Sequence, residues 1–153
     1  MTEPQPPTGP GTPDRDMERL NIKVLVADDE PAVSRISVRF LESMGCTVEV
    51  VDSGQKLIDR LMGSSKGEFG LVITDQRMPV GGKSAMTGVE ALEQIHTNEY
   101  LRSLNLPVIL NSSGLDDDDL EKVNKYHCTY LQKPCSIKEF QATVLKVVKE
   151  HMA

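Results

Sequence analysis

Residues 22–30 read IKVLVADDE, a short apolar stretch that ends in three acidic residues. The aliphatic, β-branched run predicts a buried strand at residues 22–27. Asp28 and Asp29 follow at once, so both would stand at the carboxyl end of that strand. In open α/β sheets, ligands bind outside the carboxyl ends of the strands. The stretch therefore predicts a central strand and also the edge of the sheet at which chemistry should be sought.

The same alternation of apolar runs and amphipathic stretches continues along the chain. Strands are predicted at residues 22–27, 47–51, 69–74, 107–111 and 129–132, and helices at residues 31–44, 53–62, 88–96, 115–126 and 136–150. Parallel strands need crossover connections, so five strands alternating with five helices predict a parallel α/β sheet. The first helix is expected to bury its apolar side chains, which are Val33, Ile36, Phe40, Leu41 and Met44.

The length of 153 residues suits one domain and a tail. Residues 1–20 hold five of the nine prolines and are predicted to be a disordered tail, with the domain at residues 21–153. A linker to a partner domain is the alternative for this segment. The last predicted helix stops almost at the C-terminus, so no output domain is expected to follow.

Charge and cysteine content narrow the class of protein. The net charge of −6 disfavours binding to nucleic acid or to an anionic membrane surface. Cys46, Cys128 and Cys135 are odd in number and widely spaced, which argues against a disulfide framework and against a zinc site. No signal peptide and no apolar run near transmembrane length is present. A cytoplasmic location is expected, or a nuclear one in a eukaryote.

Each further strand delivers a polar residue to the same predicted edge. Asp75 follows the third strand, Ser112 the fourth and Lys133 the fifth. Carboxylates that are brought together repel one another and remain ionised only beside a cation, and oxygen ligands suit Mg²⁺. A nucleophilic carboxylate, a metal ion, an ammonium group and a hydroxyl are the groups that phosphoryl transfer requires. The set therefore predicts a Mg²⁺-dependent phosphoryl-transfer site.

In their order and spacing, the segments VLVADDE, VITDQRMP, PVILNSSG and YLQKP resemble the receiver domains of two-component response regulators and hybrid histidine kinases. The similarity covers residues 22–152. The resemblance implies a flavodoxin-like (βα)5 single domain with a parallel five-stranded sheet of order 2-1-3-4-5. It also implies a signalling protein that assists its own phosphorylation and dephosphorylation and is not otherwise an enzyme.

The resemblance also implies how the acidic residues act. Asp75 would accept the phosphoryl group from a phosphohistidine on a histidine kinase or on a histidine phosphotransfer protein. Asp29 would bind Mg²⁺ directly, and Asp28 largely through water. The backbone carbonyl of Arg77 would complete the metal shell.

The remaining roles concern the other side of the site. The resemblance implies that Lys133 pairs with Asp75 and the phosphoryl group, and that the Lys133–Pro134 bond is cis. Ser112 would close on a phosphoryl oxygen, and Tyr130 would be the aromatic switch. A downstream protein would dock on the fourth helix, fifth strand and fifth helix.

Some positions depart from the family pattern. Residues 80–85 lengthen the loop beside Asp75, either as a partner contact or as a tolerated insertion. Arg77 and Gly114 lie two residues after Asp75 and Ser112, and we expect both to modulate the lifetime of the phosphoryl group.

Other interpretations of the same residues remain open. Asp28 and Asp29 could cap the following helix, Tyr130 could be a packing residue, and Asp116 to Asp119 are better explained as a helix N-terminus than as a metal motif. At the level of function, the alternatives are a pseudo-receiver that only binds proteins, and a phosphatase with an aspartate nucleophile.

Overall fold

The structure is a computed structural model that describes residues 19–78 and 85–152. Its strands are β1 (Lys23–Ala27), β2 (Thr47–Val51), β3 (Leu71–Thr74), β4 (Val108–Ser112) and β5 (Thr129–Gln132). Its helices are α1 (Pro31–Ser43), α2 (Gly54–Met62), α3 (Gly88–Thr97), α4 (Glu99–Ser103), α5 (Asp117–Lys125) and α6 (Ile137–Met152).

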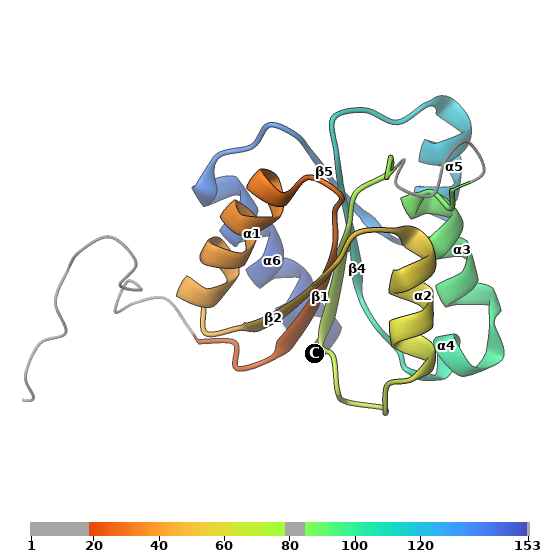
Figure 1. Cartoon of the computed structure of the whole chain (residues 1–153), viewed down its shortest axis with the longest axis horizontal. Coiled ribbons are helices and arrows are strands. Elements are labelled where there is room, and N and C mark those ends of the chain that lie inside the picture. The colour runs from red at the N-terminus through yellow and green to blue at the C-terminus, as the bar shows by residue number, and fades with distance from the viewer. Residues whose placement is uncertain (1–18, 79–84, 153) are drawn as a thin grey trace, which may run out of the picture.

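The five strands form one parallel sheet of order β2-β1-β3-β4-β5, which confirms the predicted topology. Helices α1 and α6 cover one face of the sheet, and α2 to α5 cover the other (Figure 1). Because all strands run in one direction, their carboxyl ends meet at one edge, which is the upper edge in Figure 1 and is called the rim below.

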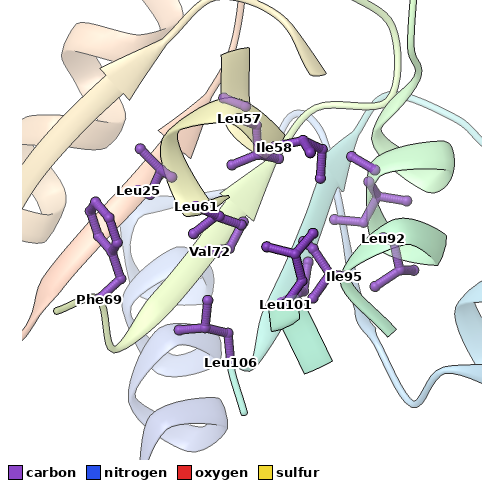
Figure 2. Close-up of a cluster of buried hydrophobic side chains, with 14 of the residues drawn as sticks. Leu25, Leu57, Ile58, Leu61, Phe69, Val72, Leu92, Ile95, Leu101 and Leu106 are labelled. Atoms are coloured by element: carbon purple, nitrogen blue, oxygen red, sulfur yellow. The ribbon is translucent and has the colours of Figure 1, made fainter. Parts of the chain in front are cut away.

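The alternation of side chains along each strand builds a core on both faces of the sheet. In β1, Leu25 packs into the cluster beneath α2 and α3, whereas Val24 and Val26 pack into the cluster beneath α1 and α6. Figure 2 shows the first cluster, in which Leu25 and Val72 of the sheet meet apolar side chains of the covering helices. Burial on both faces explains why the central strands are continuously apolar.

The predicted helix boundaries agree with the structure to within two residues, but two expectations about the helices were wrong. The structure contains the additional five-residue helix α4, which is too short to show a helical period in the sequence. In α1, Ile36 is 53% exposed, and Ser34 and Ser37 are buried with Leu41. The helix therefore presents a partly polar face to the protein, and the Ser34 hydroxyl is satisfied by donating to the carbonyl of Pro31.

Two expected features lie largely outside the described residues. Of the predicted tail, only Arg19 and Leu20 are described, and the amide of Leu20 donates to the carbonyl of Met44 at 2.9 Å. Of the loop insertion at residues 80–85, only Ala85 is described. The disordered tail and the role of the insertion stay predictions.

Candidate functional site

The backbone of the sheet brings the three predicted site segments to the rim. The amide of Asp28 donates to Val51 of β2, the amide of Asp75 to Ala27 of β1, and the amide of Lys133 to Ser112 of β4, at 2.9 to 3.0 Å. Each bond continues a strand pairing by one residue beyond the regular strands. The backbone hydrogen bonds of the sheet therefore fix the positions of the Cα atoms that carry these side chains.

Asp75 is held on both of its carboxylate oxygens. Its Oδ1 accepts a hydrogen bond from the amide of Gln76 at 2.7 Å, and its Oδ2 accepts one from Lys133 Nζ at 3.1 Å. The side chain is only 11% exposed. These bonds orient the carboxylate at the rim and leave it partly accessible to solvent.

The start of α3 packs directly against Asp75, and it requires a glycine. A Cβ atom on Gly88 would lie 2.1 Å from the carbonyl oxygen of Asp75 and 2.8 Å from Leu110. Real Cβ contacts are never that short, so either the helix or the Asp75 backbone would have to move. Thr87 and Glu90 form a capping box that starts the helix at this point.

Lys133 joins the acids from the far side of β4. Its Nζ donates to Asp28 Oδ2 at 2.9 Å and to Asp75 Oδ2 at 3.1 Å, and its side chain is 19% exposed. Burial disfavours the ammonium, but the hydrogen bonds and negative charges of the two acids outweigh burial and raise the pKa of Lys133. The lysine therefore stays charged. The Lys133–Pro134 bond is cis, as the resemblance implied.

Asp28, Asp29 and Asp75 form the acidic cluster that the sequence predicts. Each offers one carboxylate oxygen, and these oxygens lie within 4.8 Å of one another. Burial, together with the negative charges of Asp28 and then Asp75, raises the pKa of Asp29. Among the described residues, the one lysine paired with this cluster therefore does not balance three acids. Hard oxygen donors with excess negative charge fit Mg²⁺, so the residues present suit the expected ion.

Arg77, whose backbone carbonyl was predicted to join the metal shell, lies two residues beyond Asp75, and its side chain is exposed. The helix-cap interpretation of the acids at the end of β1 is not supported. The residue at the N-cap of α1 is Glu30, which makes no capping bond through its side chain. The Asp28 side chain instead accepts from the amide of Glu30 and from Lys133.

Ser112 ends β4 at the rim, and Tyr130 of β5, which pairs with Leu110, reaches it through its hydroxyl. The Ser112 side chain is buried, and its hydroxyl donates to the carbonyl of Gly114 at 3.2 Å. The Tyr130 hydroxyl donates to the carbonyl of Ser112 at 3.2 Å, and that carbonyl also accepts from the amide of Lys133. A Cβ atom on Gly114 would meet nothing within 4 Å. Both residues are therefore next to the cluster, but in the described structure the Ser112 hydroxyl is turned toward Gly114.

One residue at the rim, Gln76, was not identified from the sequence. Gln76 is only 5% exposed and is hydrogen-bonded to Asp75, α3 and α5. Glutamine belongs to no motif at this position. Its adjacency to Asp75 was the only available signal, and many polar residues follow strands by chance.

Comparisons with known proteins identify the same chain segment. A sequence model of the response regulator receiver domain matches residues 24–145. The probable methanogenesis regulatory protein FilR2 of Methanothrix harundinacea is 30% identical over 134 residues, covering 84% of this chain and 81% of that protein. Histidine kinase 1 of Arabidopsis thaliana is 25% identical over 159 residues, but the match spans only 13% of its length.

A solved structure supports the fold independently. The CheY-like response regulator receiver domain protein from Methanospirillum hungatei JF-1 superposes with a TM-score of 0.73 at 20% identity, covering 86% of this chain and 96% of that one. Within the described ranges, no helix has the length and hydropathy needed to cross a membrane.

Proposed function

The chain belongs to the response regulator receiver domain family of two-component signalling, and we propose that it takes a phosphoryl group onto Asp75 from a phosphohistidine in a Mg²⁺-dependent reaction. One observation carries the proposal. Lys133 Nζ bridges Asp28 and Asp75, and Asp29 completes a cluster of three acids around the same point. A partly buried lysine and an acidic cluster that can hold a cation, both placed at one carboxylate, are what phosphoryl acceptance needs.

The proposed step is an in-line displacement by the Asp75 carboxylate. One of its oxygens forms a bond to phosphorus while the bond from phosphorus to the imidazole nitrogen breaks, and the electron pair of that bond stays on the donor histidine. Lys133, already 3.1 Å from Asp75 Oδ2, offsets the negative charge that arrives with the phosphoryl group. The Ser112 hydroxyl would leave Gly114 and donate to a phosphoryl oxygen.

The proposed metal site consists of Asp28, Asp29 and Asp75 with the backbone carbonyl of Arg77. Bound Mg²⁺ would neutralise phosphoryl oxygens that the lysine does not reach. Without that ion, burial and then the charge imbalance, through Asp28 and Asp75, raise the pKa of Asp29. This imbalance supports a cation at the site in the working protein.

Phosphorylation is proposed to change the face formed by α5, β5 and α6, where a downstream protein would dock. Tyr130 lies on β5 with its hydroxyl on Ser112, so it is placed to respond to movement at the rim. The donor would be a histidine kinase or a histidine phosphotransfer protein. We propose a cytoplasmic or nuclear location, which agrees with three free cysteines. We also propose that the domain is a phosphoacceptor and not an enzyme that turns over an external substrate.

Arg77 and Gly114 are proposed to set the lifetime of the acyl phosphate. The Arg77 side chain is exposed beside Asp75, and Gly114 holds the Ser112 hydroxyl. Arg77→Ala is expected to change the rate at which phosphorylated protein loses its phosphoryl group, followed as loss of label after the donor is removed. An unchanged rate would remove Arg77 from this role.

The test is labelling with acetyl phosphate and with a phosphohistidine donor, each with and without Mg²⁺. Wild-type protein should be labelled only with Mg²⁺, and Asp75→Asn should not be labelled. Asp59→Asn is the matched control, because Asp59 is an exposed aspartate of α2 whose side chain accepts from Gln55 in its own helix. Labelling of Asp75→Asn would contradict the proposal. Failure of the wild type to take label or to bind Mg²⁺ would instead favour a pseudo-receiver that serves as a binding module.

A further inference from the structure

Gln76 stands where three elements meet. Its amide donates to Asp75 Oδ1 at 2.7 Å, and its carbonyl accepts from the amide of Gly88 at 2.9 Å. Its side-chain Oε1 accepts from the amide of Val89 at 2.7 Å, and its Nε2 donates to Asp119 Oδ2 at 3.1 Å. One buried residue therefore connects the phosphoacceptor, the first turn of α3 and the first turn of α5.

Helix α5 has few other attachments to the protein. Val123 is its one fully buried residue, and the rest of its sequence is mostly charged. Lys122 pairs with Glu93 of α3 at 3.7 Å, but both side chains are 41% exposed, so this pair contributes little. Helices with little buried apolar surface are the elements that shift at low cost. The bond from Gln76 to Asp119 is thus a large part of what positions the start of α5, which lies beside α3 in Figure 1.

Asp119 is not simply one of several solvated acids at the start of α5. Asp116 caps the helix by accepting from the amide of Asp119 at 2.8 Å, as expected for a helix N-terminus. Burial and the neighbouring charge of Asp116 raise the pKa of Asp119, so holding its carboxylate there costs free energy. The Gln76 amide acts in the opposite direction and partly offsets that cost.

We propose that the Gln76 side chain is a positioning residue that transmits the state of Asp75 to α5 through Asp119, a role that rests on the proposed phosphoacceptor function. Phosphorylation converts the Asp75 carboxylate to an acyl phosphate, so the oxygen facing the Gln76 amide loses its share of the carboxylate charge. The 2.7 Å bond to Gln76 then weakens, because hydrogen bonds to charged acceptors are the stronger ones. The amide of Val89 holds Oε1 of the terminal amide group of Gln76, and Nε2 of the same group bonds Asp119. A displacement of the Gln76 backbone therefore reaches Asp119.

The pair offers a donor–acceptor exchange as a test. Asp119→Ala removes the acceptor on α5 and leaves the bond between Gln76 and Val89 in place, whereas Asp119→Asn keeps an acceptor oxygen. Gln76→Glu keeps an acceptor for Val89 but sets a carboxylate against Asp119. Combining Gln76→Glu with Asp119→Asn restores one amide donor and one carboxylate acceptor, with the roles exchanged and the net charge unchanged.

The measurement is the change in backbone amide chemical shifts of α5 when Mg²⁺ and beryllofluoride are added to the isotope-labelled full chain. Wild type, Asp119→Asn and the double variant should show the α5 response. Asp119→Ala and Gln76→Glu should lose it while shifts near Asp75 still change. Loss of the α5 response with the shifts near Asp75 retained is a result that a purely structural role would not give, and restoration in the double variant assigns the loss to this hydrogen bond. If Gln76→Glu does not fold, Asp119→Ala decides.

Retention of the α5 response in Asp119→Ala, or its absence in a folded double variant, would overturn this inference and leave the proposed function standing. Failure of the proposed phosphoacceptor function would be recognised by another result, obtained with the wild type. If wild-type protein shows no shift near Asp75 with Mg²⁺ and beryllofluoride and takes no label from acetyl phosphate, then the proposed function fails and the inference fails with it.

Discussion

Strand β1 carries a charge cluster at each end, and the two clusters differ in balance. At its amino end, Lys23 and Arg60 face Glu49 and Glu68, with two positive and two negative groups. At its carboxyl end, within the part of the chain that the structure describes, three acids gather and one basic side chain, Lys133, pairs with two of them. Both clusters use the same chemistry of carboxylates and basic side chains. The difference teaches that a cluster of paired charges can serve the fold, whereas acids in excess of the basic groups support the cation that we propose at the rim.

The pKa directions express this difference. Hydrogen bonds from Arg60 lower the pKa values of Glu49 and Glu68, so ionisation of these acids is favoured by folding. Burial and the neighbouring acids raise the pKa of Asp29, so its ionisation is disfavoured. The amino-end cluster therefore stabilises the native chain, whereas the ionised Asp29 at the rim costs free energy when no cation is added.

The largest expected effect comes from displacing the rim cluster without touching its charges. Gly88→Ala would place a Cβ atom 2.1 Å from the Asp75 carbonyl, and we expect it to reduce the free energy of unfolding by about 3 kcal/mol. Denaturant unfolding measures the loss. Gly114→Ala is the control, because its Cβ atom would meet nothing within 4 Å and should change stability by less than about 0.5 kcal/mol. Equal stability of the two variants would contradict the geometry at α3.

The second expected effect tests the charge imbalance of the rim cluster. Mg²⁺ at 100 times its Kd should raise the free energy of unfolding of the wild type by about 2.7 kcal/mol. Asp29→Asn should lose most of this gain and should be more stable than the wild type without Mg²⁺, because a charge that burial and the neighbouring acids disfavour is gone. Thermal unfolding with and without Mg²⁺ measures both quantities.

Glu49→Gln supplies the control for that measurement. It removes a charge from the balanced cluster, so it should lower stability and leave the response to Mg²⁺ unchanged. A Mg²⁺ response that survives in Asp29→Asn but disappears in Glu49→Gln would reverse the assignment of the two clusters.

A smaller effect is expected at the amino end. Arg60→Met leaves Glu49 and Glu68 without their guanidinium partner, and we expect a fall in Tm of only a few degrees because the group is partly exposed. Both glutamate pKa values are lowered in the folded state. The difference in stability between Arg60→Met and the wild type should therefore have its full size above the glutamate pKa of the unfolded chain, about 4.3. It should fade as the pH falls through the lowered pKa values of the folded protein.

The measurement is a series of unfolding curves between neutral and acidic pH, repeated at high salt, which should shrink the difference. A difference that grows toward acidic pH would mean that the Arg60 cluster does not act through these ionised acids.

The smallest effect concerns the polar contacts around the rim. Tyr130→Phe removes one hydrogen bond to the Ser112 carbonyl, which keeps its bond from the Lys133 amide. We expect a loss of about 0.5 kcal/mol in urea unfolding, with labelling of Asp75 retained. A loss above about 2 kcal/mol would show that Tyr130 is chiefly a structural residue of the rim.

Much of this molecule could be predicted from its sequence. The central strands and their polar ends are visible because burial on both faces demands continuous apolar runs, and polar residues begin where burial stops. The positions of Asp28, Asp75 and Lys133 follow from this rule. The hydrogen bonds from Lys133 to Asp28 and Asp75 show that the rule brings these three side chains together.

The parts that could not be predicted depend on tertiary packing. The face of α1 was misjudged because serines can be buried in a helix, as Ser34 and Ser37 are, and the Ser34 hydroxyl bonds within the helix, so apolar spacing alone did not fix the helix rotation. Gln76 gave no signal because its importance comes from Val89 and Asp119, which are distant in sequence. The requirement for glycine at residue 88 appears only when the Asp75 carbonyl is seen beside it.

The most direct test of the central claim is the chemical identity of the phosphorylated residue. Wild-type protein would be treated with acetyl phosphate and Mg²⁺, then reduced with borohydride, which converts an aspartyl phosphate to homoserine, and the digested peptides would be read by mass spectrometry. We predict homoserine at position 75 alone, and none when Mg²⁺ is omitted. Homoserine at the position of Asp28 or Asp29, or label at no aspartate in protein that binds Mg²⁺, would contradict the claim that this rim holds a phosphoacceptor at Asp75.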